Sequence, residues 1–394
     1  MMMADPDTTP HPVGAVLWDV AAAAPDLLAA MPALANAIAP LRAAVPVAHS
    51  ISPFDGVGAV RPYRHLRAFY LRRPDGVIAV KGSEIMAGDV DTHLRMLGSY
   101  RIEFPGRGRS LFSALEHFPL NEQKVPLALP VEEALEDVHA AAAVQQAHLA
   151  RFGTLARVPL PLLALRWPDA VMDAYLRRLS PLLSGRARRT VERVAADGLG
   201  CVIYHYPAVP LRVAHLPELL AGRPGNGWQA RLSGLTGVEA ALEGWLDLLA
   251  RLLVLGFLPG SVESIGVGHC LEMKNAVIDG GLVDMGSICR VETVAEDRIF
   301  LETLMVALAD LAKTCRQFLL GDSPDVEAEY RNPSLVMVLL LHRLLPDLAA
   351  RVEGLGGADP RILAVLRARP AAPALPGELA RLAGLGTLAT GGHR

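Results

Sequence analysis

The pattern of hydrophobic and polar residues divides this chain into two parts. Up to residue 206 the apolar residues gather in short runs typical of strands, whereas beyond Gly237 they recur at the spacing of an α-helix. A turn at residues 73–76 joins the first two of the four predicted strands, which cover residues 64–71, 77–81, 157–165 and 200–206. A long Ala-rich helix interrupts them over residues 131–152, where acidic residues follow Pro130 and Gly153 ends the pattern.

The second part begins with an apolar helix over residues 238–255 and a short hairpin over residues 276–283. Strongly apolar helices are predicted over 298–320 and 334–352, and the Pro/Gly/Ala-rich tail after Gly354 is expected to pack loosely. These elements predict an α+β fold in three segments: an N-terminal helical extension over residues 1–54, a mixed β/α N-lobe over 55–208 and a helical C-lobe over 209–394.

Composition narrows the class of protein. The chain has 394 residues, of which 52% are hydrophobic and 20% charged, so a sizeable core is expected. A net charge of −3 without a basic stripe gives no case for nucleic-acid binding. Four cysteines without a C-x-x-C pair favour a reduced, cytoplasmic protein. Prolines and aspartates interrupt the Ala-rich segment 13–47, so we expect neither a signal peptide nor a membrane span.

The hairpin over residues 276–283 carries the first candidate chemistry. Its Gly280-Gly281 pair predicts a two-residue turn in which both glycines take positive φ. Such a hairpin would bring Asn275 and Asp284 side by side as an amide oxygen and a carboxylate. Those are hard oxygen donors that suit Mg²⁺. The alternative is a surface turn with incidental polar residues at its ends, because Asn and Asp favour turns.

Lys81 is the second candidate, because only four lysines occur and this one ends the apolar run Ile78-Ala79-Val80. A compact ammonium at a strand end suits phosphate, although it can equally be a surface lysine. Its expected partner is a glutamate that the sequence does not single out, and the candidates are Glu132, Glu133 and Glu136, with Glu84 and Glu116 as rivals.

Four further residues are weaker candidates. Gly56 and Gly58 form a Gly-x-Gly that could cradle phosphate, although a Gly pair more often marks a turn, and residues 106–108 repeat the pattern. Glu272 is a candidate general base and Lys274 a candidate phosphate clamp, unless both are simply solvated. The basic run Arg186, Arg188 and Arg189 is interpreted as the solvated face of a helix.

Taken in order, Lys81, the helix after it, Asn275 and Asp284 resemble the protein-kinase-like superfamily, and the local motifs resemble the selenoprotein O family within it. Val80-Lys81-Gly82 is similar to that family's strand ending in Lys-Gly, and the segment from Asn275 to Gly286 has the same spacing through a hairpin to Asp-x-Gly. The resemblance implies a bilobal kinase-like fold binding Mg²⁺-ATP between its lobes, with Lys81 on phosphate and with Asn275 and Asp284 on the metal.

One departure from the kinase pattern bears on the reaction. Cys270 stands five residues before Asn275, where ordinary kinases place a catalytic Asp. The selenoprotein O family also lacks that Asp and transfers AMP, so the expected activity is ATP- and Mg²⁺-dependent phosphoryl or adenylyl transfer to an unidentified acceptor, a small molecule or a protein. The alternatives are an inactive pseudokinase that acts as a binding scaffold and a helical structural protein with an incidental hairpin.

Overall fold

The computed structural model divides the chain into two compact units. The sheet unit comprises Met1–Gln146 and Pro159–Val209, and the helical unit comprises Ala147–Val158 and Pro210–Arg394. The structure describes residues 8–48, 59–60, 68–83, 129–180, 185–213, 237–259, 262–263, 266–267, 275–286, 288–294, 296, 300, 303–304, 307–308, 311–312, 314 and 344–367.

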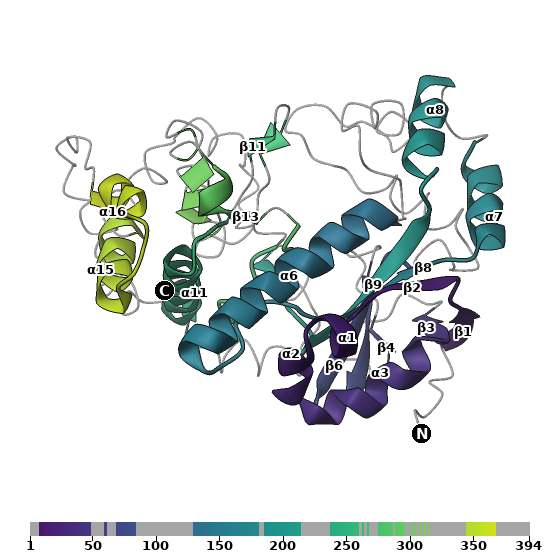
Figure 1. Ribbon diagram of the computed structural model, residues 1–394, viewed down its shortest axis with the longest axis horizontal. Helices are drawn as coiled ribbons and strands as arrows, with labels where there is room; N and C mark the ends of the chain where they lie inside the picture. The colour runs from purple at the N-terminus through teal and green to yellow at the C-terminus, as the bar shows by residue number, and fades with distance from the viewer. Residues whose placement is uncertain are drawn as a thin grey trace, which may run out of the picture. The chain divides into compact units, whose positions relative to one another are not determined.

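The sheet unit is built on an antiparallel sheet whose main path runs β2-β8-β9-β6-β5-β4, with β7 also paired to β9. Its strands are β2 (Ala15–Asp19), β4 (Ala59–Val60), β5 (Ala68–Arg73), β6 (Gly76–Lys81), β7 (Leu129–Pro130), β8 (Leu160–Arg166) and β9 (Leu199–Tyr206). β9 is buried along its whole length and lies between β8 and β6 (Figure 1). A strand paired on both edges and covered on both faces accounts for its uninterrupted apolar sequence.

The predicted hairpin between β5 and β6 is confirmed, with Pro74 and Asp75 at its turn. Gly76 follows with a φ of +136°, a conformation that side-chain-bearing residues rarely adopt. A Cβ on Gly76 would lie 2.3 Å from the carbonyl oxygen of Tyr206, so glycine also allows β6 to approach the end of β9. The turn and the sheet therefore both require glycine at this position.

The N-terminal segment contributes strands as well as helices, which differs from the purely helical extension we expected. Its helices are α1 (Val20–Ala23), α2 (Pro25–Ala29), the 3₁₀ turn η1 (Pro32–Leu34) and α3 (Ala35–Leu41). β1 (Thr8–Pro12) pairs with β3 (Ala44–Ala48), and β2 joins the main sheet beside β8. The apolar run Val16-Leu17-Trp18 in β2 gives a weak strand signal, because the alanines that follow it favour helix in isolation.

The long helix α6 (Val131–Phe152) has the bounds that its sequence predicts. Gly153 follows it with a φ of +70°, and its N–H donates to the carbonyl of Leu149 at 2.9 Å. This is the left-handed glycine that commonly ends a helix. Two helices lie between β8 and β9, namely α7 (Asp169–Leu179), which the sequence pattern does not indicate, and α8 (Gly185–Val194), which contains the basic run interpreted as a helix face and exposes Arg188 and Arg189.

The helical unit packs α11 (Gly237–Val254) against α15 (Leu345–Leu355), and α15 against α16 (Pro360–Arg367). Small antiparallel pairs accompany them, formed by β10 (Phe257–Leu258) with β13 (Cys289–Arg290) and by β11 (Val262–Glu263) with β12 (Gly266–Val267). α16 lies in the tail that we expected to pack loosely. Its Ile362 and Leu366 are buried, so that expectation is wrong for this helix.

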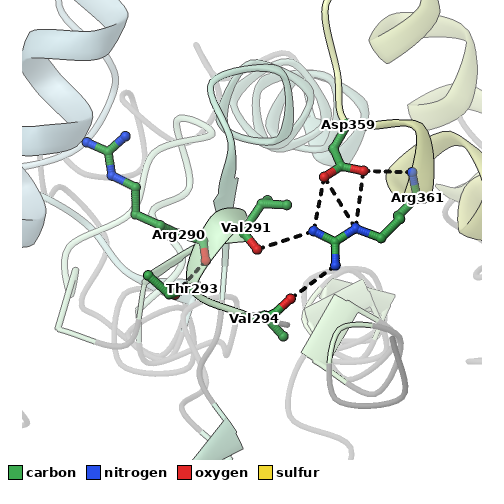
Figure 2. A network of polar contacts seen from close by, with 6 residues as sticks. All are labelled: Arg290, Val291, Thr293, Val294, Asp359 and Arg361. Atoms are coloured by element: carbon green, nitrogen blue, oxygen red, sulfur yellow. Dashed lines mark hydrogen bonds and ion pairs between the residues drawn. The ribbon is translucent and has the colours of Figure 1, made fainter. Parts of the chain in front are cut away.

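A polar network fixes the start of α16 (Figure 2). Arg361 pairs with Asp359 at 3.0 Å and donates to the carbonyls of Val294 at 3.0 Å and Val291 at 3.4 Å. Val291 belongs to the 3₁₀ turn η6 (Val291–Thr293), which directly follows β13. The guanidinium also lies 4.8 Å from the centre of the Phe300 ring, a cation–π contact. One arginine thus joins α16 to the segment after β13.

These elements establish a mixed α+β fold, as the sequence predicts. Among the described residues, no helix combines the length and the apolar character that a bilayer crossing requires.

Candidate functional site

Lys81 lies at the end of β6, where the predicted strand places it. Its ammonium forms an ion pair with the carboxylate of Asp137 on α6. Both side chains are largely withdrawn from solvent, with 14% of Lys81 and 3% of Asp137 exposed. Burying one charge without the other would be costly, so the two residues depend on each other.

The acidic partner is Asp137, which differs from the glutamates that we considered. The buried face of α6 follows a helical spacing through Ala134, Val138 and Ala141, and Asp137 lies on that face. Glu132 and Glu136 are exposed on the helix. A charged residue on an apolar helical stripe is the sequence feature that could have identified Asp137, because a buried carboxylate requires a partner.

Gly82 supports the position of Lys81. It has a φ of +90°, and a Cβ there would lie 2.6 Å from the Cβ of Leu129 and 2.7 Å from the carbonyl oxygen of Gly200. The buried indole of Trp167 donates to the Gly82 carbonyl at 3.0 Å. The Lys-Gly pair is therefore a structural unit in which glycine lets the backbone turn away directly after the lysine.

The predicted hairpin that carries Asn275 and Asp284 is present in the helical unit. Ala276 pairs with Leu282, and the N–H of Val283 donates to the carbonyl of Asn275 at 3.0 Å. Asn275 therefore opposes Val283, and Asp284 follows at the same end of the hairpin. Asn275 is 5% exposed and Asp284 is partly exposed.

The turn of this hairpin differs from the Gly-Gly turn we expected. Val277 donates to the carbonyl of Gly281 at 2.9 Å, and Gly280 donates to that of Val277 at 2.9 Å. Three residues, Ile278 to Gly280, therefore form the loop, and of the two glycines only Gly280 takes positive φ, at +86°. A tight turn ending in a left-handed glycine is a common three-residue hairpin connection. Gly281 therefore lies in the strand after the turn, where it pairs with Val277.

Neighbouring segments of the helical unit hold both edges of the hairpin. Ile278 donates to the carbonyl of Leu211 at 2.8 Å, and Val213 donates to that of Ala276 at 2.9 Å. On the other edge, Leu282 donates to the carbonyl of Arg157 at 3.0 Å. The Arg157 side chain donates in turn to the carbonyl of Asp279, also at 3.0 Å.

A helix also approaches the loop of this hairpin closely. A Cβ on Gly244 of α11 would lie 2.8 Å from the Cα of Gly280, so glycine is needed on the helix side. A hairpin this short is marginal by itself, and these contacts determine its position.

The oxygen donors at Asn275 and Asp284 suit Mg²⁺, which uses one or two protein oxygens and completes its octahedron with water and phosphate. Within the described residues there is no group of three or more His, Cys, Asp or Glu side chains that could hold a metal by themselves. Two protein oxygens are the number with which Mg²⁺ is commonly held beside a phosphate ligand.

Other predicted site residues lie outside the described part of the chain. These are Gly56, Gly58, Glu272 and Lys274, together with Cys270 and the rival partners Glu84 and Glu116.

Comparison with protein-family models and with curated proteins finds no match for this chain.

Proposed function

We propose that this protein is an ATP- and Mg²⁺-dependent transferase of kinase-like fold, which moves a phosphoryl or an adenylyl group to an acceptor. The observation that carries the proposal is the ion pair between Lys81 at the end of β6 and Asp137 on α6. A lysine at a strand end, held by a helical carboxylate, is the arrangement with which kinases neutralise the phosphates of ATP.

The metal would be held by Asn275 and Asp284. Their hairpin is anchored on both edges, which supports a fixed geometry for ligands at its open end. Transfer of a phosphoryl or adenylyl group depends mainly on positioning and charge neutralisation, so a lysine and a metal supply much of the required chemistry. The acceptor hydroxyl would need a separate base, for which Glu272 is the candidate.

Thermal unfolding with and without Mg²⁺-ATP tests the proposal. Nucleotide at about 100 times its dissociation constant adds roughly 2.7 kcal/mol of stability to the state that binds it. For units of this size that corresponds to a rise of about 2–4 °C per kcal/mol. The rise should disappear in Asp284→Asn. It should persist in Asp279→Asn, which removes a charge from the same hairpin but keeps the oxygen that accepts from Gly281 at 3.0 Å.

The products then separate activity from binding alone. ADP would indicate phosphoryl transfer, whereas pyrophosphate or an AMP-labelled acceptor would indicate adenylyl transfer. Nucleotide binding without either product would establish an inactive pseudokinase. An unfolding temperature unaffected by ATP or GTP, with Mg²⁺ or Mn²⁺, would refute the transferase.

A further inference from the structure

The sheet unit carries a concentration of arginine that the proposed transferase does not use. Between residues 176 and 193 the chain has six arginines and one acidic residue, Glu192, although its net charge is −3. This segment includes the end of α7 and most of α8. Arg177, Arg188 and Arg189 are exposed there. Such a local excess of positive charge favours an anionic ligand.

An open hollow of about 540 Å³ lies at these helices, lined by Asp173, Leu176, Arg177, Ser180 and Arg188. Figure 1 shows α7 and α8 as neighbouring helices at the same end of β8 and β9. The volume falls within the range of roughly 300–1,000 Å³ that is typical of small-molecule sites. The hollow therefore has the size for a small ligand, and two arginines line it.

The guanidinium of Arg188 is held in position by the backbone. Its Nε donates to the carbonyl of Ser180 at 3.2 Å, at the end of α7. A single bond through Nε does not use the two terminal nitrogens, which are the pair that recognises phosphate bidentately. In the described part of the chain, neither Arg177 nor Arg188 forms an ion pair with a carboxylate.

We propose that this hollow binds a small organic phosphate that also carries hydroxyl groups, such as a sugar phosphate. Arg177 and Arg188 bind the phosphate, because guanidinium groups match its geometry and charge. Asp173 accepts a hydrogen bond from a ligand hydroxyl, and Leu176 contacts the carbon skeleton. The carboxylate explains why a phosphate with hydroxyl groups fits better than a bare anion. This site is independent of the nucleotide site proposed above.

Isothermal titration of the full chain with glucose 6-phosphate, inorganic phosphate, sulfate and glucose tests the site at constant ionic strength. Glucose 6-phosphate should bind more tightly than phosphate, and glucose should not bind. Arg177→Gln and Arg188→Gln should each weaken binding about tenfold, the scale of one charge-assisted hydrogen bond. Arg189→Gln is the matched control. It removes a positive charge from α8, as Arg188→Gln does, but the Arg189 side chain does not line the hollow. Its affinity should stay within about twofold of the wild type, because screening weakens more distant charges.

Asp173→Asn distinguishes recognition of the ligand's hydroxyl groups from recognition of its phosphate. It should weaken glucose 6-phosphate relative to sulfate, because sulfate has no hydroxyl donor at neutral pH whereas the sugar has several. Within the described residues Arg177 makes no backbone contact like that of Arg188, so Arg177→Gln serves as a check if Arg188→Gln disturbs α7. Equal losses in Arg177→Gln and Arg189→Gln would overturn the proposal in favour of general charge attraction. Absence of binding by glucose 6-phosphate, or binding only to vesicles with anionic headgroups, would also overturn it.

Discussion

The Lys81 ammonium and the Asp137 carboxylate form an ion pair between residues 56 positions apart in the chain, one at the end of β6 and one within α6. Both groups are buried deeply enough that each compensates for the desolvation of the other. The pair thereby joins the central sheet to its long helix through charge, at a place where apolar contacts would be the ordinary choice.

Replacing Lys81 by Met should lower the free energy of unfolding by about 3–5 kcal/mol, because it removes the ammonium that compensates for burial of the Asp137 carboxylate. The double variant Lys81→Met/Asp137→Leu should recover most of the loss, since it removes both charges together. Urea unfolding of the wild type, both single variants and the double variant completes the cycle. If the loss of stability in the double variant equals the sum of the losses in the two single variants, the two residues do not interact in solution.

Gly82→Ala should lower the free energy of unfolding by more than the cost of a positive φ alone. Its backbone conformation costs about 1–2 kcal/mol for any residue with a Cβ. The clash with Leu129 and the Gly200 carbonyl adds about 1–3 kcal/mol of overpacking. Gly153→Ala is the matched control, because it has a φ of +70° but nothing within 4 Å of the added Cβ. Equal losses in the two variants would show that the sheet accommodates the methyl group at Gly82.

Arg157→Gln should weaken Mg²⁺-ATP binding if the transferase proposal holds, because the hairpin that carries Asn275 and Asp284 loses the bond to the Asp279 carbonyl. One such hydrogen bond is worth about 1 kcal/mol, or roughly fivefold in affinity. Arg157→Lys keeps a donor and should recover part of the loss. Arg151→Gln removes an exposed arginine of the same unit and should leave affinity unchanged. Mn²⁺ electron paramagnetic resonance measures these affinities. Equal affinities in all variants would exclude Arg157 as a positioning residue.

Acid should destabilise the fold through two buried histidines. Burial lowers the pKa of His205 below its ordinary value, against an opposing contribution from its hydrogen bond to the Asp75 carbonyl. Burial also lowers the pKa of His148. The unfolded chain then binds more protons than the folded one below about pH 6.5, so stability falls as pH falls through that region. Comparing wild type and His205→Gln between pH 7.5 and 5 should show a smaller loss in the variant, whereas identical slopes would contradict a contribution from His205.

The sequence predicts elements well where local chemistry decides them. The two ends of α6 and the Pro74-Asp75-Gly76 turn are local features, and both are confirmed. Asp137 was not predicted because a glutamate was expected as the partner of Lys81, although the apolar stripe of α6 places Asp137 on the buried face. The position of β2 depends on β8, far along the chain, and an Ala-rich context conceals it.

In the hairpin over residues 276–283 the sequence predicts the two arms correctly and the turn incorrectly. Its two arms follow from the apolar runs around Gly280 and Gly281, and the ladder between them is present. Its turn instead reflects the register, since Val277 pairs with Gly281 and places Asp279 in the loop. Two consecutive glycines do not reveal which of them will take positive φ, because that depends on pairings made beyond the turn.

The place of β9 in the sheet has a consequence for synthesis on the ribosome. β9 is the last strand of the sheet in the chain, yet it lies between β8 and β6, which precede it. Until Tyr206 has left the exit tunnel, β6 and β8 each present an unpaired edge rich in apolar residues. During synthesis both edges therefore remain unpaired and prone to aggregation, until β9 emerges and pairs with β6 and β8 together.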